Sequence, residues 1–172
     1  MTAIQKGLLL TALQLTLVLT LAAKLLYDRS TRPRVWVLSR VYDPNLPIRG
    51  RYLSEQLELP VEGLPYTVPD KNALDWYINR QWAYFEFRDG QLIAKQQGSS
   101  PGAWVHIHKN NDGAIVAFIE EPVLVFISDT AQVPTLAAGQ EAWVEVTVPA
   151  KGPLRPIRIG IKKDGAITPL NL

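Results

Sequence analysis

Residues 7–26, GLLLTALQLTLVLTLAAKLL, divide the chain into two unlike parts. They contain a single charged residue, Lys24. An α-helix rises 1.5 Å per residue, so about 20 residues cross the roughly 30 Å hydrocarbon core of a bilayer. The stretch therefore predicts a transmembrane helix within residues 1–27, with Lys24 extending to the interface and Tyr27 in the aromatic belt.

Two other interpretations fit the same residues. In a cleaved signal peptide, Lys6 forms the basic region, residues 8–20 form the apolar region, and Thr20-Leu21-Ala22 is a weak cleavage site. In a soluble fold, a helix this apolar needs neighbours on every side, and the sequence offers no second helix of this kind. We favour the uncleaved signal anchor.

The charge of the chain is unevenly distributed. Residues 1–34 carry a net charge of +4 and residues 35–172 a net charge of −2. The pI of 8.9 is thus a property of the membrane flank, and we expect no nucleic-acid partner. The arginines after the helix favour a cytoplasmic C-terminus, whereas long domains cross membranes largely regardless of charge. We prefer the domain on the outer side.

The remaining chain predicts a linker and one domain. Residues 28–34, DRSTRPR, read as a polar juxtamembrane linker, because Pro33 stops a helix. Residues 35–172 are numerous enough to bury a core of their own. The chain has no cysteine, which excludes disulfides, thiolate catalysis and zinc–thiolate sites.

Alternating apolar residues predict a mainly β domain, an antiparallel β-barrel or sandwich. Asp-Gly pairs at 89–90, 112–113 and 164–165 predict hairpin turns. Pro60 is expected to end the second strand, and residues 70–82 predict one short helix with Asp70 as its cap. The expected strands cover residues 34–41, 51–59, 83–87, 91–95, 104–109, 114–120, 123–128, 142–148, 155–162 and 166–170.

Small and polar residues recur along the apolar stretch. Ala12, Thr16 and Thr20 stand four residues apart, and Gln14 adds an amide to the same helix. Small residues at this spacing let two helices approach closely, and an amide in hydrocarbon favours a partner. These four residues predict a helix–helix contact in the membrane. In the alternative, the threonines bond to their own helix and Gln14 is tolerated.

A short motif follows the first expected strand. Asp43-Pro44 precedes Arg49-Gly50-x-Tyr52, behind an N-terminal membrane anchor. In this layout the chain resembles the GDYXXLXY family of membrane-anchored bacterial proteins of unknown function. The glycine and the first tyrosine of the family motif are present at positions 50 and 52.

The chain also departs from that family motif. Arg51 replaces its aspartate, Glu55 its leucine and Leu57 its last tyrosine. The resemblance implies no established activity. It implies a membrane-anchored bacterial protein with a polytopic membrane protein as partner. Together with the preferred orientation, we expect a bacterial inner-membrane protein whose periplasmic domain binds a polytopic membrane protein or envelope complex beside the lipid bilayer.

The same motif offers candidate partner-binding residues. Arg49 and Arg51 flank Gly50, and one of them presents a two-pronged donor to a carboxylate or phosphate in the functional interpretation. Tyr52 packs its ring on the sheet beside them. In the structural interpretation, Gly50 allows the backbone to enter the strand and Tyr52 seals that entry.

Two histidines are the most plausible metal ligands in the sequence. His106 and His108 are two residues apart on an expected strand, so they share one face. If Lys109 pairs with Ala114, residues 115, 117 and 119 lie opposite, and none supplies a third ligand. We expect no metal and no cofactor. No nucleophile, phosphate-loop or metalloprotease motif occurs, so we expect no enzymatic activity.

Five tryptophans remain to be explained. We expect most of them in the core and rim of a small barrel, and a ligand-stacking surface is the alternative. Two functions stay open. One is a non-enzymatic accessory protein that docks on a membrane or envelope partner, favoured by a filled barrel. The other is a module binding a small molecule or carbohydrate, favoured by a tryptophan-lined cavity of a few hundred Å³.

Overall fold

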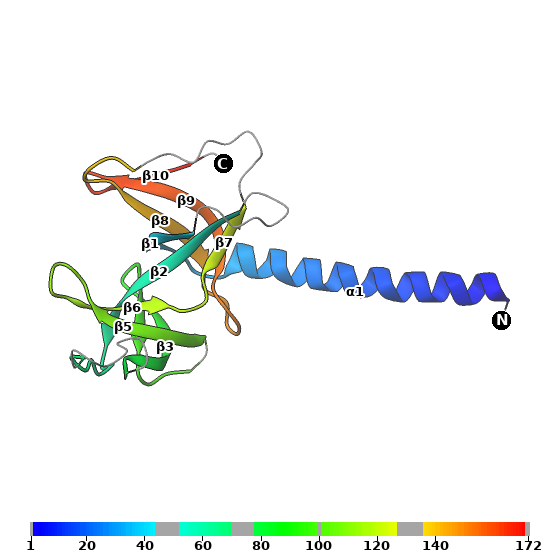
Figure 1. Ribbon diagram of the computed structural model, residues 1–172. Helices are drawn as coiled ribbons and strands as arrows, with labels where there is room; N and C mark the ends of the chain where they lie inside the picture. The colour runs from blue at the N-terminus through cyan, green and yellow to red at the C-terminus, as the bar shows by residue number, and fades with distance from the viewer. Residues whose placement is uncertain (1, 44–51, 70–77, 100, 127–135, 171–172) are drawn as a thin grey trace. The chain divides into compact units, whose positions relative to one another are not determined.

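The computed structural model describes residues 2–43, 52–69, 78–99, 101–126 and 136–170. The chain forms two compact units, Met1–Arg32 and Pro33–Leu172. The first is a single helix and the second is a β-domain (Figure 1).

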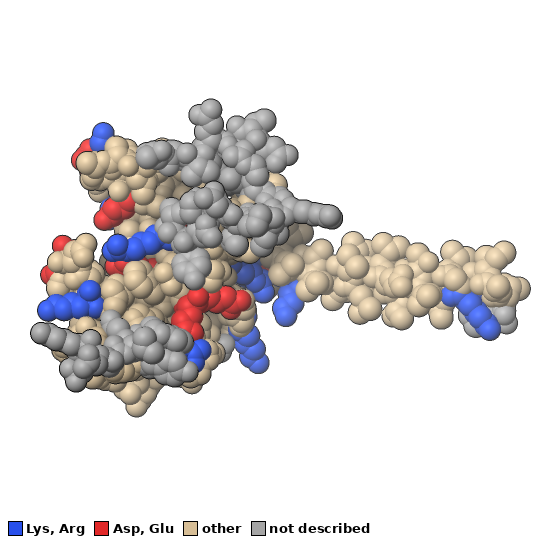
Figure 2. All heavy atoms as spheres, in the orientation of Figure 1, with Lys and Arg blue, Asp and Glu red and all other residues tan. Residues whose placement is uncertain are grey.

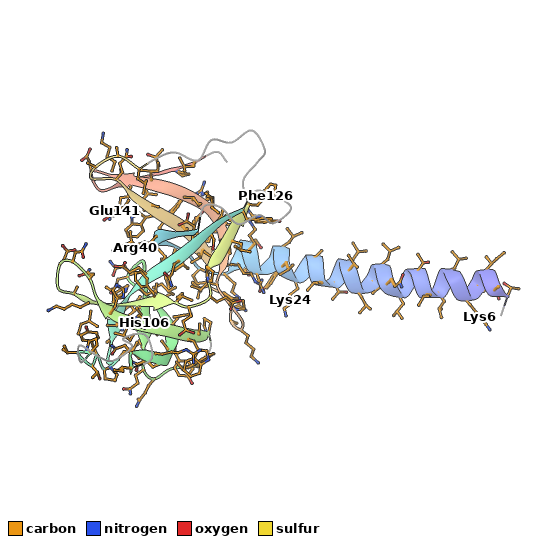
Figure 3. All side chains as sticks on the ribbon, in the orientation of Figure 1. Lys6, Lys24, Arg40, His106, Phe126 and Glu141 are labelled. Atoms are coloured by element: carbon orange, nitrogen blue, oxygen red, sulfur yellow. The ribbon has the colours of Figure 1, made fainter. Side chains whose placement is uncertain are left out.

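The helix α1 spans Ala3–Thr31. Thr2 caps it, because its hydroxyl accepts from the Gln5 amide while the Gln5 side chain accepts from the Thr2 amide. With 29 residues and a mean hydropathy of 1.9 in its most apolar part, α1 is long and apolar enough to cross a membrane, as a signal sequence near the N-terminus also is. Lys6 and Lys24 lie toward its two ends (Figure 3), and the surface between them is uncharged (Figure 2).

The helix extends beyond the expected end at Tyr27. Asp28 to Thr31 are helical, so most of the expected linker belongs to α1. Arg32 caps the helix, donating its backbone N–H to the Asp28 carbonyl at 2.9 Å, and Pro33 follows. The β-domain begins at once with a strand at Arg34.

Ten strands make up the described part of the β-domain, in agreement with the expected mainly β fold. They pair in the order β10-β9-β8-β1-β2-β4-β3-β5-β6, and β7 pairs with β2. Their bounds are β1 Arg34–Asp43, β2 Tyr52–Glu62, β3 Arg80–Arg88, β4 Gln91–Lys95, β5 Gly102–Lys109, β6 Ile115–Ile119, β7 Val123–Phe126, β8 Glu141–Thr147, β9 Arg155–Lys163 and β10 Ala166–Pro169.

The long strand β2 belongs to two sheets (Figure 1). Through its pairing with β1 it continues a four-stranded antiparallel sheet, β10-β9-β8-β1. Through β6 and β4 it closes a five-stranded barrel, β2-β4-β3-β5-β6. The contact of β2 with β4 is short and parallel, with Val61 opposite Ala94 and Glu62 opposite Lys95. The other strand pairs among the described residues are antiparallel.

Side chains fill the barrel. Small residues on β3, β4 and β6 and branched residues on β5 are completely buried: Ala83, Ala94, Ala117, Val105 and Ile107. Alternating small and large residues in this way fits the narrow interior of a five-stranded barrel. No tryptophan of the described residues belongs to this core. Of the expected core and rim positions, the core is therefore wrong for the four described tryptophans: Trp36 and Trp143 are half-buried, and Trp82 and Trp104 are exposed.

Two of the expected elements differ from the structure. The end of the helix expected over residues 70–82 is strand, because β3 already starts at Arg80; residues 70–77 lie outside the described residues. The strand β2 continues past Pro60 to Glu62. A proline is tolerated within a strand where its missing N–H faces an edge without a hydrogen-bonded neighbour. At residues 59–60, β2 has no strand paired to the edge that β1 and β4 occupy elsewhere.

Two of the three expected Asp-Gly turns have the conformation typical of a two-residue hairpin. In the β3–β4 turn Asp89 and Gly90 both have positive φ, 51° and 79°, and in the β9–β10 turn Asp164 and Gly165 have 51° and 83°. Two successive residues with positive φ define the two-residue turn that matches the twist of a hairpin. Asp-Gly pairs favour this conformation, so the local sequence determines where these hairpins reverse.

Candidate functional site

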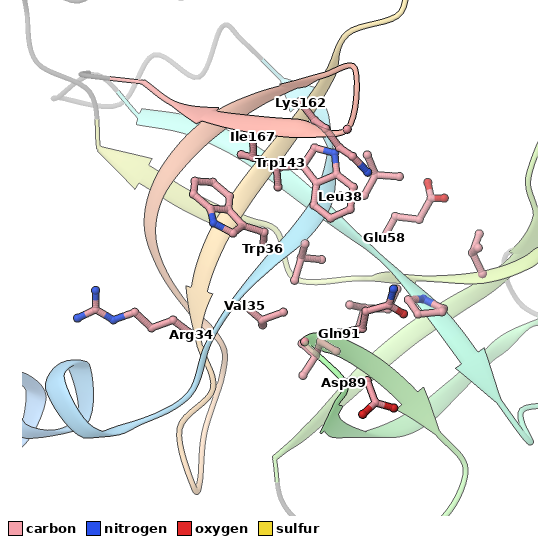
Figure 4. A pocket seen from close by; sticks show the side chains of 17 residues that line it. Arg34, Val35, Trp36, Leu38, Glu58, Asp89, Gln91, Trp143, Lys162 and Ile167 are labelled. Atoms are coloured by element: carbon pink, nitrogen blue, oxygen red, sulfur yellow. The ribbon is translucent and has the colours of Figure 1, made fainter.

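A cleft of about 650 Å³ opens beside the barrel (Figure 4). Its walls come from β1, β2, β4, β6 and β8, from the β3–β4 turn and from the β9–β10 hairpin. The cleft exists because two neighbours of β2 diverge. β1 pairs with β2 up to Leu38 and Glu58, and β4 joins β2 at Val61, so a wedge opens between β1 and β4.

Two tryptophans form the aromatic wall of the cleft (Figure 4). Trp36 lies against Gly160, where a Cβ atom would stand 3.0 Å from the Trp36 ring, so glycine lets the ring approach the strand. The Trp143 indole N–H donates to Glu141 at 3.0 Å. Both rings are half-buried and present apolar surface to the cleft.

Cations lie over both rings. The Arg158 guanidinium is 5.5 Å from the Trp36 ring centroid, and the Lys162 ammonium is 4.4 Å from that of Trp143. Such contacts hold an aromatic ring in place and orient the cation. Arg158 also donates to the mostly buried Glu145 at 2.7 Å. The aromatic wall is thus held by charged side chains of β9 and β8.

The opposite side of the cleft carries acidic groups. Glu58 is 5% exposed and accepts from Arg40 at 2.9 Å, so its charge is compensated. The β3–β4 hairpin adds Asp89 and Gln91 to the lining, below the two tryptophans in Figure 4. Lys162 on one wall and Asp89 on the other leave the lining without a dominant sign of charge.

An ion network lies at the barrel seam beyond the cleft. Arg88 and Lys95 each contact both Glu62 and Glu86, with Arg88–Glu62 at 2.5 Å and Lys95–Glu86 at 2.7 Å. The hydrogen bond from Arg88 lowers the pKa of Glu62, and that from Lys95 lowers the pKa of Glu86. The four side chains come from β2, β3 and β4, so the network reinforces the short parallel pair that closes the barrel.

The predicted partner-binding residues are separate from this cleft. Tyr52 is 38% exposed at the start of β2, and its ring meets Phe126 of β7 edge-on at 5.5 Å. Phe126 is 61% exposed at the end of its strand (Figure 3). Arg49 and Arg51, with Gly50, lie outside the described residues. Tyr52 does not line the cleft.

The register of the histidine strand differs from the expectation. Lys109 pairs with Ile115, so His106 lies opposite Phe118 and His108 opposite Val116. The shift arises because Asn110 takes the place next to Ala114: its N–H donates to the Ala114 carbonyl at 2.8 Å. Its side chain also accepts from the Asp112 and Ala114 amides.

The two histidines are packed against aromatic surface. Their rings lie parallel with centroids 6.5 Å apart, and His108 stacks on Phe118 at 4.0 Å. Within the described part of the chain, no three potential metal ligands gather at one place. The absence of a structural metal stays a prediction.

The predicted membrane-packing residues lie along α1. The Thr16 and Thr20 hydroxyls donate to the carbonyls four residues earlier, of Ala12 and Thr16, at 2.8 and 2.7 Å. The helix thus satisfies both hydroxyls itself. Ala12, Thr16 and Thr20, like Gln14, are exposed on the helix surface, so the contact with a second helix stays a prediction.

A buried carboxyl group lies within β2, apart from the cleft. Glu55 is 1% exposed and accepts a hydrogen bond from the Ser39 hydroxyl. Burial raises the pKa of Glu55, and the Ser39 hydrogen bond lowers it by less. Ser54, also completely buried, has no hydrogen-bond partner for its hydroxyl among the described residues.

Comparison of the chain with family models, with curated proteins and with solved structures finds no match. Nothing in the local sequence separates Trp36 and Trp143 from the other three tryptophans. Their alternation on strands was visible, but their meeting depends on the pairing of β1 with β8, which brings together residues about a hundred positions apart.

Proposed function

We propose that the protein is a non-enzymatic, membrane-anchored accessory protein whose β-domain docks on a membrane or envelope partner through the cleft. The single observation that supports this function best is the open, tryptophan-lined cleft of about 650 Å³ beside a barrel whose interior holds buried side chains. We therefore assign recognition to the outside of the barrel. Exposed aromatic surface at a concave site is typical of interfaces.

The composition of the cleft supports a binding role over a catalytic one. Among the residues that the structure describes, its lining includes no serine, threonine, tyrosine or histidine. Its buried carboxylate, Glu58, is engaged by Arg40, and Lys162 lies on a tryptophan ring. A nucleophile with an adjacent base, the usual arrangement for covalent catalysis, is therefore not formed by the residues that line it.

We also propose a location. The apolar part of α1 holds the protein in a bacterial inner membrane as a single-pass anchor, with the β-domain in the periplasm. The length and composition of α1 support the anchor. The proposed orientation agrees with the ability of long domains to cross membranes largely regardless of their flanking charge. The resemblance to the GDYXXLXY family supports the bacterial setting and a polytopic partner.

A second candidate function is the binding of a small molecule or carbohydrate. It is favoured by the volume of the cleft, which lies in the range of small-ligand sites, and by its two tryptophans. Against it, Lys162 and Arg158 lie over the rings and would have to move before a sugar could stack on those faces. A docked polypeptide contacts ring edges and strand walls without displacing either cation.

Co-purification in mild detergent tests the proposed function. The tagged full-length chain is purified from membranes as wild type, as Trp143→Ala, and as Trp104→Ala, a control tryptophan that is 45% exposed on the barrel. Partners identified by mass spectrometry should fall at least about tenfold for Trp143→Ala and persist for Trp104→Ala.

A second variant tests the cleft without altering a half-buried tryptophan. Gln91→Arg changes an exposed side chain on the other wall of the cleft, where folding tolerates a charge. Thermal unfolding establishes that each variant is folded. Equal partner recovery from all folded variants would reject the cleft as the docking site.

A further inference from the structure

A second pocket of the β-domain, of about 380 Å³, is separate from the cleft. Its lining comes from Arg40 of β1, Gln56 of β2, Phe118 of β6, and residues 108–111, where β5 ends and the turn to β6 begins. None of these residues lines the cleft. The pocket is therefore a distinct candidate site, with a chemistry of its own.

The charges in this pocket have one sign. Arg40 and Lys109 are exposed cations, and among the described residues no carboxylate lines the pocket. The cleft differs, because two basic and two acidic residues line it together. Residues 35–172 carry a net charge of −2, so this pocket gathers positive charge on a domain that is acidic as a whole. A concave site of one sign attracts ligands of the opposite sign.

The guanidinium of Arg40 is already oriented by its neighbours. Its Nε donates to the mostly buried Glu58 at 2.9 Å, and its central carbon lies 5.8 Å from the Phe118 ring centroid. Glu58 thus compensates part of the charge of Arg40. The two terminal nitrogens of Arg40 donate to no acceptor among the described residues. This end of the guanidinium can offer two parallel N–H groups to an oxyanion.

The second cation lies beside the β5–β6 turn. A Cβ atom at Gly113 would stand 3.4 Å from Lys109 Cε, so the stem of Lys109 runs along the turn. The Asn110 side chain accepts from the Asp112 and Ala114 amides and thereby holds the turn in shape. Asp112 is the acidic residue nearest to Lys109 in the sequence, and it does not line the pocket. Within the described part of the chain, the Lys109 ammonium has no acceptor.

The rest of the lining suits a polar ligand. His108 stacks on Phe118 with ring centroids 4.0 Å apart, so each ring has one face covered. Gln56, Asn110 and Asn111 add side-chain amides, which both donate hydrogen bonds to hydroxyl groups and accept them. A ligand in this pocket therefore meets two cations and several amides.

We propose that this pocket binds a sugar phosphate. A phosphate monoester carries a charge of about −1.5 to −2 at pH 7, which matches the two cations, and its three terminal oxygens allow both to bind at once. A carboxylate has two oxygens, which the Arg40 fork alone can engage. The amides then bind the hydroxyl groups of the sugar. The volume lies at the lower end of the range of small-ligand sites, as a monosaccharide requires.

The proposal is independent of the docking function and of the second candidate function, because both of those concern the cleft. It is tested by isothermal titration calorimetry on the full chain in phosphatidylcholine nanodiscs. The probes are glucose 1-phosphate, glucose 6-phosphate and N-acetylglucosamine 1-phosphate. At least one should bind, and at least about tenfold more tightly than glucose, glucuronate or inorganic phosphate. An absence of binding by all three would overturn the proposal, as would equal binding of glucuronate.

Substitutions then place the binding in the pocket. Arg40→Lys keeps a cation beside Glu58 but removes the fork, and Lys109→Gln removes the other cation. Each should weaken the binding of the best probe at least about tenfold. Lys151→Gln removes an exposed cation of the β8–β9 turn and should leave the affinity unchanged. Thermal unfolding establishes that each variant is folded.

Two results would contradict the assignment of this site. Unchanged affinity in both folded pocket variants, or an equal loss in Lys151→Gln, would mean that the phosphate is attracted elsewhere on the surface. Phosphatidic acid, a lipid that also carries a phosphate monoester, distinguishes the two sources of this group. Nanodiscs that contain it should not displace the bound sugar phosphate; displacement would assign the pocket to lipid headgroups instead.

Discussion

Glu55 is the residue whose burial has the clearest consequence for stability. Its carboxyl group is almost fully enclosed in β2, and burial raises its pKa above the ordinary value of 4.5. The folded state therefore holds the proton more tightly than the unfolded chain does. The favourable contribution of this group is complete below pH 4.5 and is lost as the pH rises through the raised pKa of the folded state.

Replacement by glutamine removes this titration. For Glu55→Gln, the free energy of unfolding should rise relative to wild type as the pH increases from 4.5 toward 8, because the amide never has to ionise. Urea unfolding of the full chain in detergent micelles, repeated along this pH range, measures the difference. A difference that is independent of pH would show that Glu55 titrates alike in the folded and unfolded states.

Ser39→Ala provides the matched variant. Its hydroxyl donates to Glu55 and lowers the pKa of that carboxyl, so its removal should let the pKa rise further. The pH-dependent loss of stability should then extend to higher pH than in wild type. A loss at lower pH would mean that Ser39 favours the neutral carboxyl.

For Glu55, the sequence predicts the direction of the side chain but not the depth of its burial. Alternation along β2 puts Glu55 on the same face as Leu53 and Leu57, which predicts an inward direction. How deeply the carboxyl is enclosed depends on β1 and β7, which pair with β2 around this position. A carboxylate on an apolar face is ambiguous until those distant strands are placed.

At the scale of elements, the seating of Trp36 on β9 gives a stability prediction. A Cβ at Gly160 would stand 2.8 Å from Ile167 Cγ2 and 3.0 Å from both the Thr168 carbonyl and the Trp36 ring. Gly160→Ala should therefore cost about 1–3 kcal/mol and displace the indole. Urea unfolding measures the cost, and an unchanged midpoint would mean that Trp36 is not packed on this strand.

Elements formed by interactions between residues close in sequence were predicted more accurately than elements formed by distant residues. Asp89-Gly90 and Asp164-Gly165 determine their turns locally, and the strands beside them were predicted within a few residues. The predicted register of β5 with β6 was wrong, because the Asn110 side chain accepts hydrogen bonds within the turn and so determines its length. The strand β2 continues past Pro60 because no strand pairs with one of its edges there, and local sequence does not show which edges are paired.

The candidate site was the least predictable feature. The cleft requires β1 and β4 to diverge along one edge of β2. That arrangement follows from the closure of the barrel through the two-residue parallel contact, which joins strands about thirty positions apart. Alternation marks each strand but does not specify its neighbours, so neither the wedge nor the meeting of Trp36 and Trp143 could be read from the sequence.

For the whole molecule, the first prediction concerns its placement across a membrane. Alkaline phosphatase fused after Leu172 and expressed in bacteria should be active and should remain in the membrane fraction, because α1 is expected to stay uncleaved. An inactive fusion would mean a cytoplasmic domain. A soluble active fusion would mean that α1 is removed as a signal peptide.

The most direct test of the docking cleft is site-specific crosslinking in intact cells. The photoreactive residue p-benzoylphenylalanine replaces Gln91 at the cleft or Asp112 in the exposed β5–β6 turn of the full-length protein. Irradiation should give a discrete adduct with one partner from position 91, none from position 112, and a strongly reduced adduct when Trp143→Ala is added. No adduct at position 91, or equal adducts at both positions, would contradict the central claim that the protein docks its partner through this cleft.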